Sequence, residues 1–235
     1  MSEPLSLSVI VPVWKEAGTI VETLQALQRL RGSGHEVIVA DAGSPDGTAE
    51  LARPWCDRVV ASGKGRALQM NAGAGVARGN VLLFLHADTR LPEPALAELE
   101  SFFRSRFGWG RFDVALSACR PIFRVIAWFM NRRSRLTGIC TGDQGMFVRR
   151  AVFEALGGFR EIPLMEDVEF SRRLRLVSRP WCITQPVVTD SRRWEQNGPW
   201  RTIMLMWRLR WRYWRGESPE SLAKAYRSDV RNASE

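Results

Sequence analysis

The chain has 235 residues, 45% of them hydrophobic, which is enough for one large α/β domain or two small ones with a buried core. Its formal net charge is +9, and nearly all of its basic residues are arginines, since only Lys15, Lys64 and Lys224 are lysines. Arginine suits the recognition of phosphate groups, but the charge alone indicates only an anionic partner.

The sequence argues against several classes of protein. No run approaches the roughly 18 consecutive apolar residues that a transmembrane helix needs. The start of the chain, Met-Ser-Glu-Pro, lacks the basic and apolar regions of a secretory signal. The cysteines are scattered without a Cys-x-x-Cys pair, which argues against a zinc site or a disulfide framework and suits a reducing cytosol.

The first fifty residues alternate between strand and helix patterns. Leu7–Val13 is a continuous apolar run and predicts a buried strand. Thr19 and Glu22 have the spacing of a capping box, and apolar residues follow at helical intervals. Residues 36–40 predict a second strand, and a turn-rich loop leads from it into a helix over residues 49–52. This order predicts a parallel, doubly wound sheet.

A glycine-rich basic loop comes next. Arg58–Ala61 predicts a short strand, after which Ser62-Gly-Lys-Gly-Arg66 opens a helix that continues to Ala77. Free amides, a positive helix end and cationic side chains are what a phosphate site requires. The spacing is not that of a Walker loop. A flexible glycine turn carrying solvated charges is the alternative.

Residues 81–86 predict a strand that is buried on both faces, because its apolar run has no polar alternation. It is followed by His86, Asp88 and Thr89. An open α/β sheet places ligands at the carboxyl ends of its strands, so His86 and Asp88 are candidate cation ligands. The alternative is that Asp88 only caps the turn before Pro92.

The second half of the chain is predicted from weaker patterns. A helix is expected from about residue 92 to 103, a strand over 108–118, an apolar helix over 121–135, a loop and strand over 141–148, a helix over 151–156 and a last strand over 186–189. Another helix starts near Pro163 and has Glu166, Asp167 and Glu169 in its first turns. Acids at a helix start are also common without any function, because the helix dipole favours them.

Residues 199–215 predict a helix with two apolar faces. Leu205 and Leu209 lie on one side. The other side carries a stripe made of Trp200, Ile203, Met204, Trp207, Trp211 and Trp214, flanked by arginines. One face is expected to pack on the domain and the other on a membrane surface or a partner. Core packing with arginines that reach past it to solvent explains the composition equally well.

Together these signals follow an order that suits a nucleotide-sugar transferase. Separate strands end at Asp41, Asp88 and Asp190, the basic loop lies between the first two, and the acidic helix start follows. Such an enzyme needs a group that reads the base and a metal held by aspartate at the diphosphate. It also needs cations near the diphosphate and a carboxylate that deprotonates the attacking hydroxyl.

The sequence also resembles the inverting glycosyltransferases of family 2, which have the A-type glycosyltransferase fold. The matching stretches occur in family order and cover about residues 6–195: Ser8-Val-Ile-Val-Pro-Val-Trp-Lys-Glu16, Val39-Ala-Asp-Ala-Gly-Ser-Pro-Asp-Gly-Thr48, Lys64-Gly-Arg-Ala-Leu-Gln-Met-Asn-Ala-Gly73, Leu85-His-Ala-Asp-Thr89, Gly142-Asp-Gln-Gly-Met-Phe147 and Glu166-Asp167. The wording His-Ala-Asp-Thr and the Trp/Arg tail look most like a small bacterial subgroup labelled as arsenosugar-biosynthesis glycosyltransferases.

The resemblance implies a fold and a division of the chain. The expected fold class is α/β: a single-domain, Rossmann-like, mixed and mostly parallel sheet flanked by helices, with a C-terminal helical extension. Residues 1–195 would form the catalytic domain, with its nucleotide-binding part at about 1–90 and its acceptor part at about 91–195. Residues 196–235 would form the basic extension.

The resemblance also implies roles for individual residues. Asp167 matches the general base, with Glu166 beside it, and Asp88 matches the last aspartate of the metal motif. The nucleotide would be bound by Pro12, Val13, Glu16, Asp41 at the uracil edge, Lys64 and Arg66 near the ribose or diphosphate, Ala87 and Asp88. The acceptor or diphosphate side would contain Asp143, Gln144, Arg193 and Trp194.

Two positions depart from the family pattern. His86 replaces the first aspartate of the metal motif, and an imidazole suits Mn²⁺ better than Mg²⁺. Two alternatives remain for His86: it coordinates the metal, or it makes no contact with it. Lys15 stands where the family usually has asparagine, and it would contact the donor phosphates or the acceptor, or be solvated.

The function expected from the sequence is that of an inverting glycosyltransferase that uses a nucleotide sugar, with a UDP-sugar favoured, an unknown acceptor hydroxyl and Mn²⁺ or Mg²⁺. The alternatives are a sugar-nucleotide nucleotidyltransferase and a non-enzymatic basic protein that binds membrane or nucleic acid. For the leading function we expect no nucleic-acid partner. We expect a cytoplasmic location, and residues 199–215 are a candidate for peripheral contact with the inner face of the membrane. Whether the chain forms a homodimer is left open.

Overall fold

The computed structural model describes residues 4–231, except for the side chains of Arg193 and of residues 228–231. One eight-stranded sheet runs through the chain in the order β3-β2-β1-β4-β7-β6-β8-β5. Its strands are β1 (Leu7–Val13), β2 (Glu36–Asp41), β3 (Arg58–Ala61), β4 (Val81–Phe84), β5 (Thr89–Arg90), β6 (Trp109–Leu116), β7 (Met146–Arg149) and β8 (Trp181–Thr189).

The strand directions divide the sheet into two parts. In the first, β1 pairs in parallel with β2 and β4, and β2 pairs in parallel with β3. In the second, β7 is antiparallel to both β4 and β6, β8 is parallel to β6, and β5 is antiparallel to β8. Because β1, β2 and β4 are parallel neighbours, the loops that follow them leave from the same edge of the sheet.

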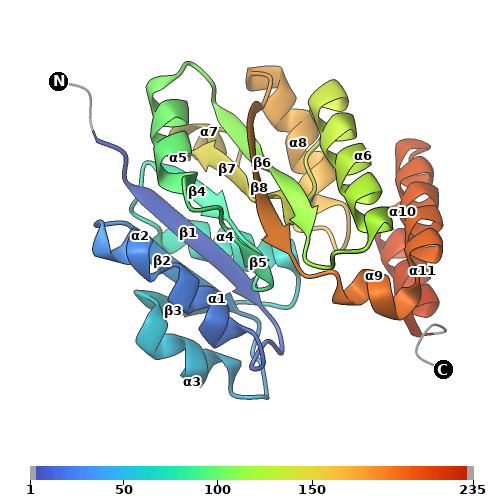
Figure 1. The fold of residues 1–235 in the computed structure, drawn as a ribbon, viewed down its shortest axis with the longest axis horizontal. Helices are drawn as coiled ribbons and strands as arrows, with labels where there is room; N and C mark the ends of the chain where they lie inside the picture. The colour runs from blue at the N-terminus through green and yellow to red at the C-terminus, as the bar shows by residue number, and fades with distance from the viewer. Residues whose placement is uncertain (1–3, 232–235) are drawn as a thin grey trace.

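Helices cover both faces of the sheet (Figure 1). They are α1 (Ile20–Ala26), α2 (Gln28–Gly32), α3 (Thr48–Ala52), α4 (Arg66–Val76), α5 (Ala95–Arg104), α6 (Pro121–Thr137), α7 (Arg150–Ala155), α8 (Glu166–Val177), α9 (Arg192–Asn197), α10 (Pro199–Trp214) and α11 (Pro219–Arg231), with short 3₁₀ turns at Arg53–Trp55 and Gly142–Gln144.

The core has two main halves because successive strand residues point to opposite faces of the sheet. Val9 of β1 lies in a cluster with Leu24 of α1 and Leu99 of α5. The next residue, Ile10, lies in the other cluster, with residues of α4, α7 and α8 such as Phe170. A strand that is buried on both faces reads as a continuous apolar run, which is why β1 was recognisable from sequence.

The C-terminal helices form a smaller core against α8. Leu205 and Leu209 of α10 pack with Leu222 of α11, and with Met165 and Val168 at the start of α8. On its other flank, α10 places Ile203 against the cluster at the base of α6. The extension therefore packs against the half of the chain that carries the acidic helix start.

The predicted fold class is confirmed: the sheet is mixed, mostly parallel and flanked by helices, and a helical extension follows it. The limits of β1 and β3 match the prediction. The strand predicted over residues 81–86 is shorter than expected, since β4 ends at Phe84.

The capping box predicted at Thr19 is wrong. The Thr19 hydroxyl caps no backbone N–H of α1 and donates instead to the Glu16 carboxylate, 2.9 Å away. Three elements had no prediction: β5, α9 and α11. Strand β8 also begins at Trp181, five residues earlier than expected from the short apolar run at its end.

Candidate functional site

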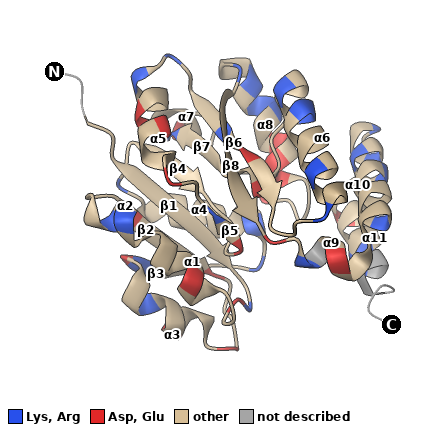
Figure 2. Ribbon diagram, viewed as in Figure 1, with Lys and Arg blue, Asp and Glu red and all other residues tan. Residues whose placement is uncertain are grey.

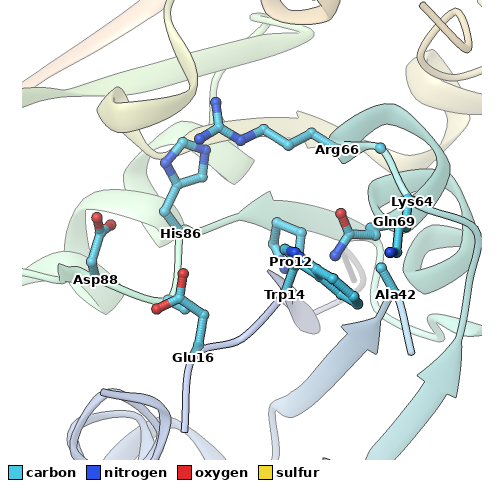
Figure 3. Close-up of a pocket in the computed structure, with 11 residues that line it drawn as sticks. Pro12, Trp14, Glu16, Ala42, Lys64, Arg66, Gln69, His86 and Asp88 are labelled. Carbon is cyan, nitrogen blue, oxygen red and sulfur yellow. The ribbon is translucent and has the colours of Figure 1, made fainter. Parts of the chain in front are cut away.

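A cavity of about 390 Å³ lies at the edge where β1, β2 and β4 end (Figure 3). It receives side chains from the loop after β1, from the start of α4 and from the turn after β4. The lining residues are Pro12, Trp14, Glu16, Ala42, Lys64, Gly65, Arg66, Gln69, His86, Ala87 and Asp88. The structure therefore brings together the basic glycine loop and the polar end of β4, which lie about twenty residues apart in the sequence.

The loop after β1 is held in place by the loop after β2. The backbone N–H groups of residues 15–17 donate in turn to the side chains of Ser44, Thr48 and Asp46, at 3.0, 2.9 and 3.2 Å. Lys15 has a φ of 58°, the left-handed conformation that asparagine adopts more readily than lysine. Position 15 therefore has a backbone conformation that suits asparagine, and this chain places a cation there.

Asp41 organises its own loop. One carboxylate oxygen accepts from the backbone N–H groups of Gly43 and Ser44, both at 3.0 Å, and the other accepts from the Ser44 hydroxyl. The residue is only 6% exposed, and neither Asp41 nor Val13 lines the cavity. Asp41 is thus beside the cavity with its hydrogen bonds already made, and its predicted contact with a base stays a prediction.

Two cations at the start of α4 border the cavity. The Lys64 ammonium lies 3.9 Å from the centre of the Trp14 ring, a cation–π contact. Arg66 reaches across the cavity toward His86 (Figure 3). Gln69, one turn further along α4, donates to the carbonyls of Val13 and Ala40 and so ties the helix to the ends of β1 and β2.

His86 and Asp88 lie on the opposite wall of the cavity. Burial, together with the nearby Arg66 charge, lowers the pKa of His86 to about 3, so its imidazole is neutral at physiological pH and keeps a free lone pair. Among the described residues, the Asp88 carboxylate accepts from the Thr89 hydroxyl alone, at 3.2 Å. Burial raises the pKa of Glu16, which also faces the Asp88 charge. This wall therefore concentrates oxygen and nitrogen ligands.

Asp167 lies next to this wall and is positioned by two backbone groups. One of its oxygens accepts from Gly142 N–H at 2.9 Å, and the other accepts from Val168 N–H at 2.7 Å. A Cβ atom on Gly142 would stand 2.6 Å from His86 Nε2. The backbone of Gly142 is thus wedged between the candidate base and the candidate metal ligand, and only glycine fits there.

The other acids of the helix start differ from Asp167. Burial and the neighbouring Asp167 charge raise the pKa of Glu166, which is 6% exposed and within electrostatic reach of Arg66. Glu169 is paired with Arg173 and Arg160, so it stabilises the helix rather than facing the site. Asp167 alone combines partial exposure with a fixed orientation.

The predicted acceptor residues have unlike surroundings. Gln144 is fully buried and donates to Ser134 and Asn131, which makes it part of the scaffold. Burial raises the pKa of Asp143, and one of its buried oxygens has no hydrogen-bond partner among the described residues. Trp194 packs partly buried beside α6. The side chain of Arg193 lies outside the described part of the structure.

Arg133 of α6 was not predicted and lies close to Asp143. Its Nε and Nη2 atoms are buried and donate to no acceptor in the part of the chain that the structure describes. Burial, with Arg210 of α10 nearby, lowers the pKa of Arg133 to about 10. A buried donor and a buried acceptor without partners therefore face the same region beside Asp167.

His86 and Asp88 are too few ligands to hold a divalent cation by themselves, so a bound molecule would have to supply further coordinating atoms. Across the described side chains, no group of three or more His, Cys, Asp and Glu residues gathers closely enough to hold a metal unaided. A neutral imidazole and one carboxylate would supply two ligands, and diphosphate oxygens and water would supply the rest. This donor set suits a metal that arrives with a nucleotide.

Sequence reasoning gave no role to Trp14, Ala42 and Gln69 among the lining residues, whereas Gly65 belongs to the basic loop that it predicted as a phosphate site. Trp14 directly follows a strand end, which was a usable signal. Gln69 carried none, because its role depends on the packing of α4 across two strand ends. Asp190, by contrast, was singled out but pairs with Arg192 and does not line the cavity.

Known proteins resemble this chain in sequence and in fold. The sequence pattern of glycosyl transferase family 2 matches residues 8–157. A beta-monoglucosyldiacylglycerol synthase of Trichormus variabilis is 24% identical over 227 residues, covering 83% of this chain and 48% of that protein. The chain thus spans about half the length of that curated relative.

Solved structures share the fold. A mannosyltransferase of Pyrobaculum calidifontis, in complex with GDP-Man and Mn²⁺, superposes with a TM-score of 0.68 at 22% identity, covering 96% of this chain and 70% of that one. TarS of S. aureus, in complex with UDP-GlcNAc, gives a TM-score of 0.63 at 19% identity, covering 79% of this chain and 58% of that one. At these identities the likeness shows the fold alone. Within residues 4–231, no helix is long and apolar enough to cross a bilayer.

Proposed function

Because the chain belongs to glycosyl transferase family 2, we propose that it transfers a sugar from a nucleotide sugar to an acceptor hydroxyl with inversion at the anomeric carbon. The observation that carries this proposal is the meeting of Arg66, His86 and Asp88 around one cavity, with Asp167 next to it. Cations, metal ligands and a carboxylate base are the groups that such a transfer uses.

The donor would occupy the cavity at the ends of β1, β2 and β4. Its base would lie toward Pro12, Ala42 and the Asp41 loop, and its diphosphate would extend toward Arg66 and Asp88. Lys64, held over the Trp14 ring, would contact the ribose or diphosphate. We favour a UDP-sugar. Of two solved structures with this fold, one is in complex with UDP-GlcNAc and the other with GDP-Man, so the identity of the base has to be tested directly.

Asp88, with His86, would hold Mn²⁺ or Mg²⁺, which when bound neutralises charge on the departing nucleoside diphosphate. A neutral His86 favours Mn²⁺, since imidazole is a poor ligand for Mg²⁺. Arg66, which lies over the same wall, would add a second positive charge near the diphosphate.

Asp167 would act as the base. It would take the proton of the acceptor hydroxyl as that oxygen attacks the anomeric carbon, and the bond from that carbon to the diphosphate oxygen would break on the opposite side. The two backbone hydrogen bonds hold the Asp167 carboxylate in one orientation, ready for the acceptor. Glu166 would remain beside Arg66 and position it.

A donor screen tests this proposal. UDP- and GDP-sugars are incubated with the protein and Mn²⁺ or Mg²⁺, and release of the nucleoside diphosphate is measured. We expect release from one class of donor only with a metal present. Formation of a nucleotide sugar from a sugar 1-phosphate and a nucleoside triphosphate would instead assign the chain to the nucleotidyltransferases, whose glycine-rich loop follows the first strand rather than the third.

The subgroup of arsenosugar biosynthesis, the division of the chain near residues 90 and 195 and the cytoplasmic location remain parts of the proposal. The sugar and the acceptor are unassigned. Contact with the inner face of a membrane through residues 199–215 is proposed as well, and its structural basis follows.

A further inference from the structure

Helix α10 uses only one of its two apolar faces for folding. Its inner face places Leu205 and Leu209 in the small core with α8 and α11. Its outer face is a stripe at helical spacing that remains 56–73% exposed: Trp200, Met204, Trp207, Trp211 and Trp214. Single exposed apolar residues are ordinary, but a continuous stripe of large ones marks an interaction surface.

The charged residues of α10 itself all have one sign. Helix α10 contains four arginines and no acidic residue, and α6 has the same composition of charges. The two helices lie side by side, since Ile203 of α10 packs with Phe123 and Ile126 of α6, and Figure 2 shows the basic residues along both. Such a surface attracts an anionic partner.

The surface also has the chemistry of a water–lipid boundary. A groove of about 570 Å³ is lined by Met204, Leu205, Trp207 and Trp211 together with Arg201 and Arg208. The Arg215 guanidinium carbon lies 4.9 Å from the centre of the Trp211 ring. Indole rings combine a large apolar body with one N–H donor, and arginine side chains reach from apolar contacts to charged head groups.

We propose that the outer face of α10 docks on the surface of an anionic lipid bilayer, with the helix lying in the plane of the interface. A helix of 16 residues is about 24 Å long, shorter than a bilayer core, and its arginines oppose insertion across it. A second copy of the chain fits this face poorly, because a two-fold contact would place the same arginine-rich surface against itself.

This docking has a consequence for the acceptor, which rests on the proposed function. Arg210 of the same helix lies within electrostatic reach of Asp143 and Arg133, beside the candidate base. Tyr226 of α11, which packs on α10, is likewise close to Arg66. A protein docked through α10 would therefore hold the acceptor side of its site near the membrane, where an amphiphilic acceptor presents its hydroxyl.

Vesicle co-sedimentation of the full chain tests the proposal. We expect binding to vesicles of phosphatidylcholine and phosphatidylglycerol, little binding to phosphatidylcholine alone, and release by added salt. The double variant Trp207→Ser/Trp211→Ser should lose about tenfold or more in vesicle affinity, because two side chains no longer enter the interface. The matched control Leu51→Ser/Leu176→Ser removes exposed apolar side chains from α3 and α8 and should bind as the parent does.

The possible outcomes separate the docking from the transferase proposal. Circular dichroism and UDP binding should be unchanged in both double variants, which shows that they are folded. Absence of vesicle binding in a chain that still binds UDP would overturn the docking alone. Equal losses in the two double variants would overturn it too, as would light scattering that shows a stable dimer broken by Trp207→Ser/Trp211→Ser without any vesicle binding.

Discussion

The N-terminal and C-terminal parts of the molecule differ in how far contacts within the fold satisfy their side chains. At the N-terminal end, Thr48 and Asp46 accept from the backbone of the loop after β1 and so tie the two loops together, while Asp41 accepts from its own loop. At the C-terminal end, α10 leaves an apolar stripe exposed, and Arg133 and Asp143 have buried atoms that find no partner in the part of the chain that the structure describes. The region proposed to bind the donor is thus held by internal hydrogen bonds. The region proposed to bind the acceptor has groups that only a ligand or a surface outside the described residues could cover or pair.

This contrast indicates where specificity is decided. The region proposed to bind the donor is already held in place by internal hydrogen bonds, so its variants should change binding. In the region proposed to bind the acceptor, Arg133 and Asp143 have buried atoms without a partner among the described residues. Such atoms cost free energy, which is recovered when a polar ligand supplies the missing partners. Variants of this region should change turnover.

The largest effect is expected from Asp167→Asn. Asparagine keeps one oxygen, which can accept only one of the two hydrogen bonds from Gly142 and Val168, and it cannot take a proton, so turnover should fall by about 100- to 10,000-fold. UDP binding should stay near the parental value, and a coupled assay of nucleoside diphosphate release measures the difference. The matched variant Glu166→Gln should cost less. Unchanged turnover in Asp167→Asn, or a larger loss in Glu166→Gln, would remove Asp167 from the role of base.

The two faces of α10 should differ sharply in stability. Leu209→Ala empties a fully buried position and should lower the free energy of unfolding by about 2–5 kcal/mol. Trp207→Ser changes a side chain that is 68% exposed and should alter it by less than about 0.5 kcal/mol. Urea unfolding followed by circular dichroism measures both. Similar losses would mean that the outer face is also part of the core.

A glycine variant tests the wedge between His86 and Asp167. Gly142→Ala places a methyl group 2.6 Å from His86 Nε2, so either the imidazole or the backbone that holds Asp167 must move. Turnover should drop by about tenfold or more, because small displacements of reacting groups are costly. Gly75→Ala is the control: its added Cβ meets no atom within 4 Å, so turnover should be parental. Parental turnover in Gly142→Ala would show that the site tolerates the shift.

Sequence predicted the donor side better than the acceptor side for physical reasons. Strands buried on both faces and glycine-rich turns are local patterns, so β1, β3 and the loop before α4 could be placed from their own residues. Gln69, Gly142 and Arg133 act through residues that are distant in sequence, and their local patterns say nothing of this. At Thr19 a local rule failed because Glu16 offered its hydroxyl a nearer acceptor.

The same limit applies to α10. Its helical period placed the tryptophans and the leucines on opposite faces, as the structure has them, but it wrongly put Ile203 on the tryptophan stripe, since Ile203 packs against α6. The period also could not say which face the domain would cover. The answer depends on α8 and on α11, a helix that the sequence did not predict. The aromatic stripe turned out to be the uncovered face.

The smallest effect concerns the protonation of the histidines. Burial lowers the pKa of both, and that of His86 falls to about 3. In the folded protein His86 should not titrate near its ordinary pKa of about 6.5, and His35 should titrate below that value, which NMR of the imidazole nitrogens between about pH 5 and 8 checks. Since the unfolded chain binds these protons first, stability should decline as the pH falls below about 6.5. A midpoint near 6.5 for His86 would mean that it is exposed and protonatable.

Calorimetric titration of UDP into the protein, with and without Mn²⁺, tests the central claim of a shared metal and nucleotide site most directly. We expect tight binding only with the metal, and a loss of about tenfold or more in Asp88→Asn, because one of the two protein ligands is removed. Asp190→Asn, the same change at a neighbouring aspartate that pairs with Arg192, should bind as the parent does. UDP binding that ignores both Mn²⁺ and Asp88→Asn would contradict the account.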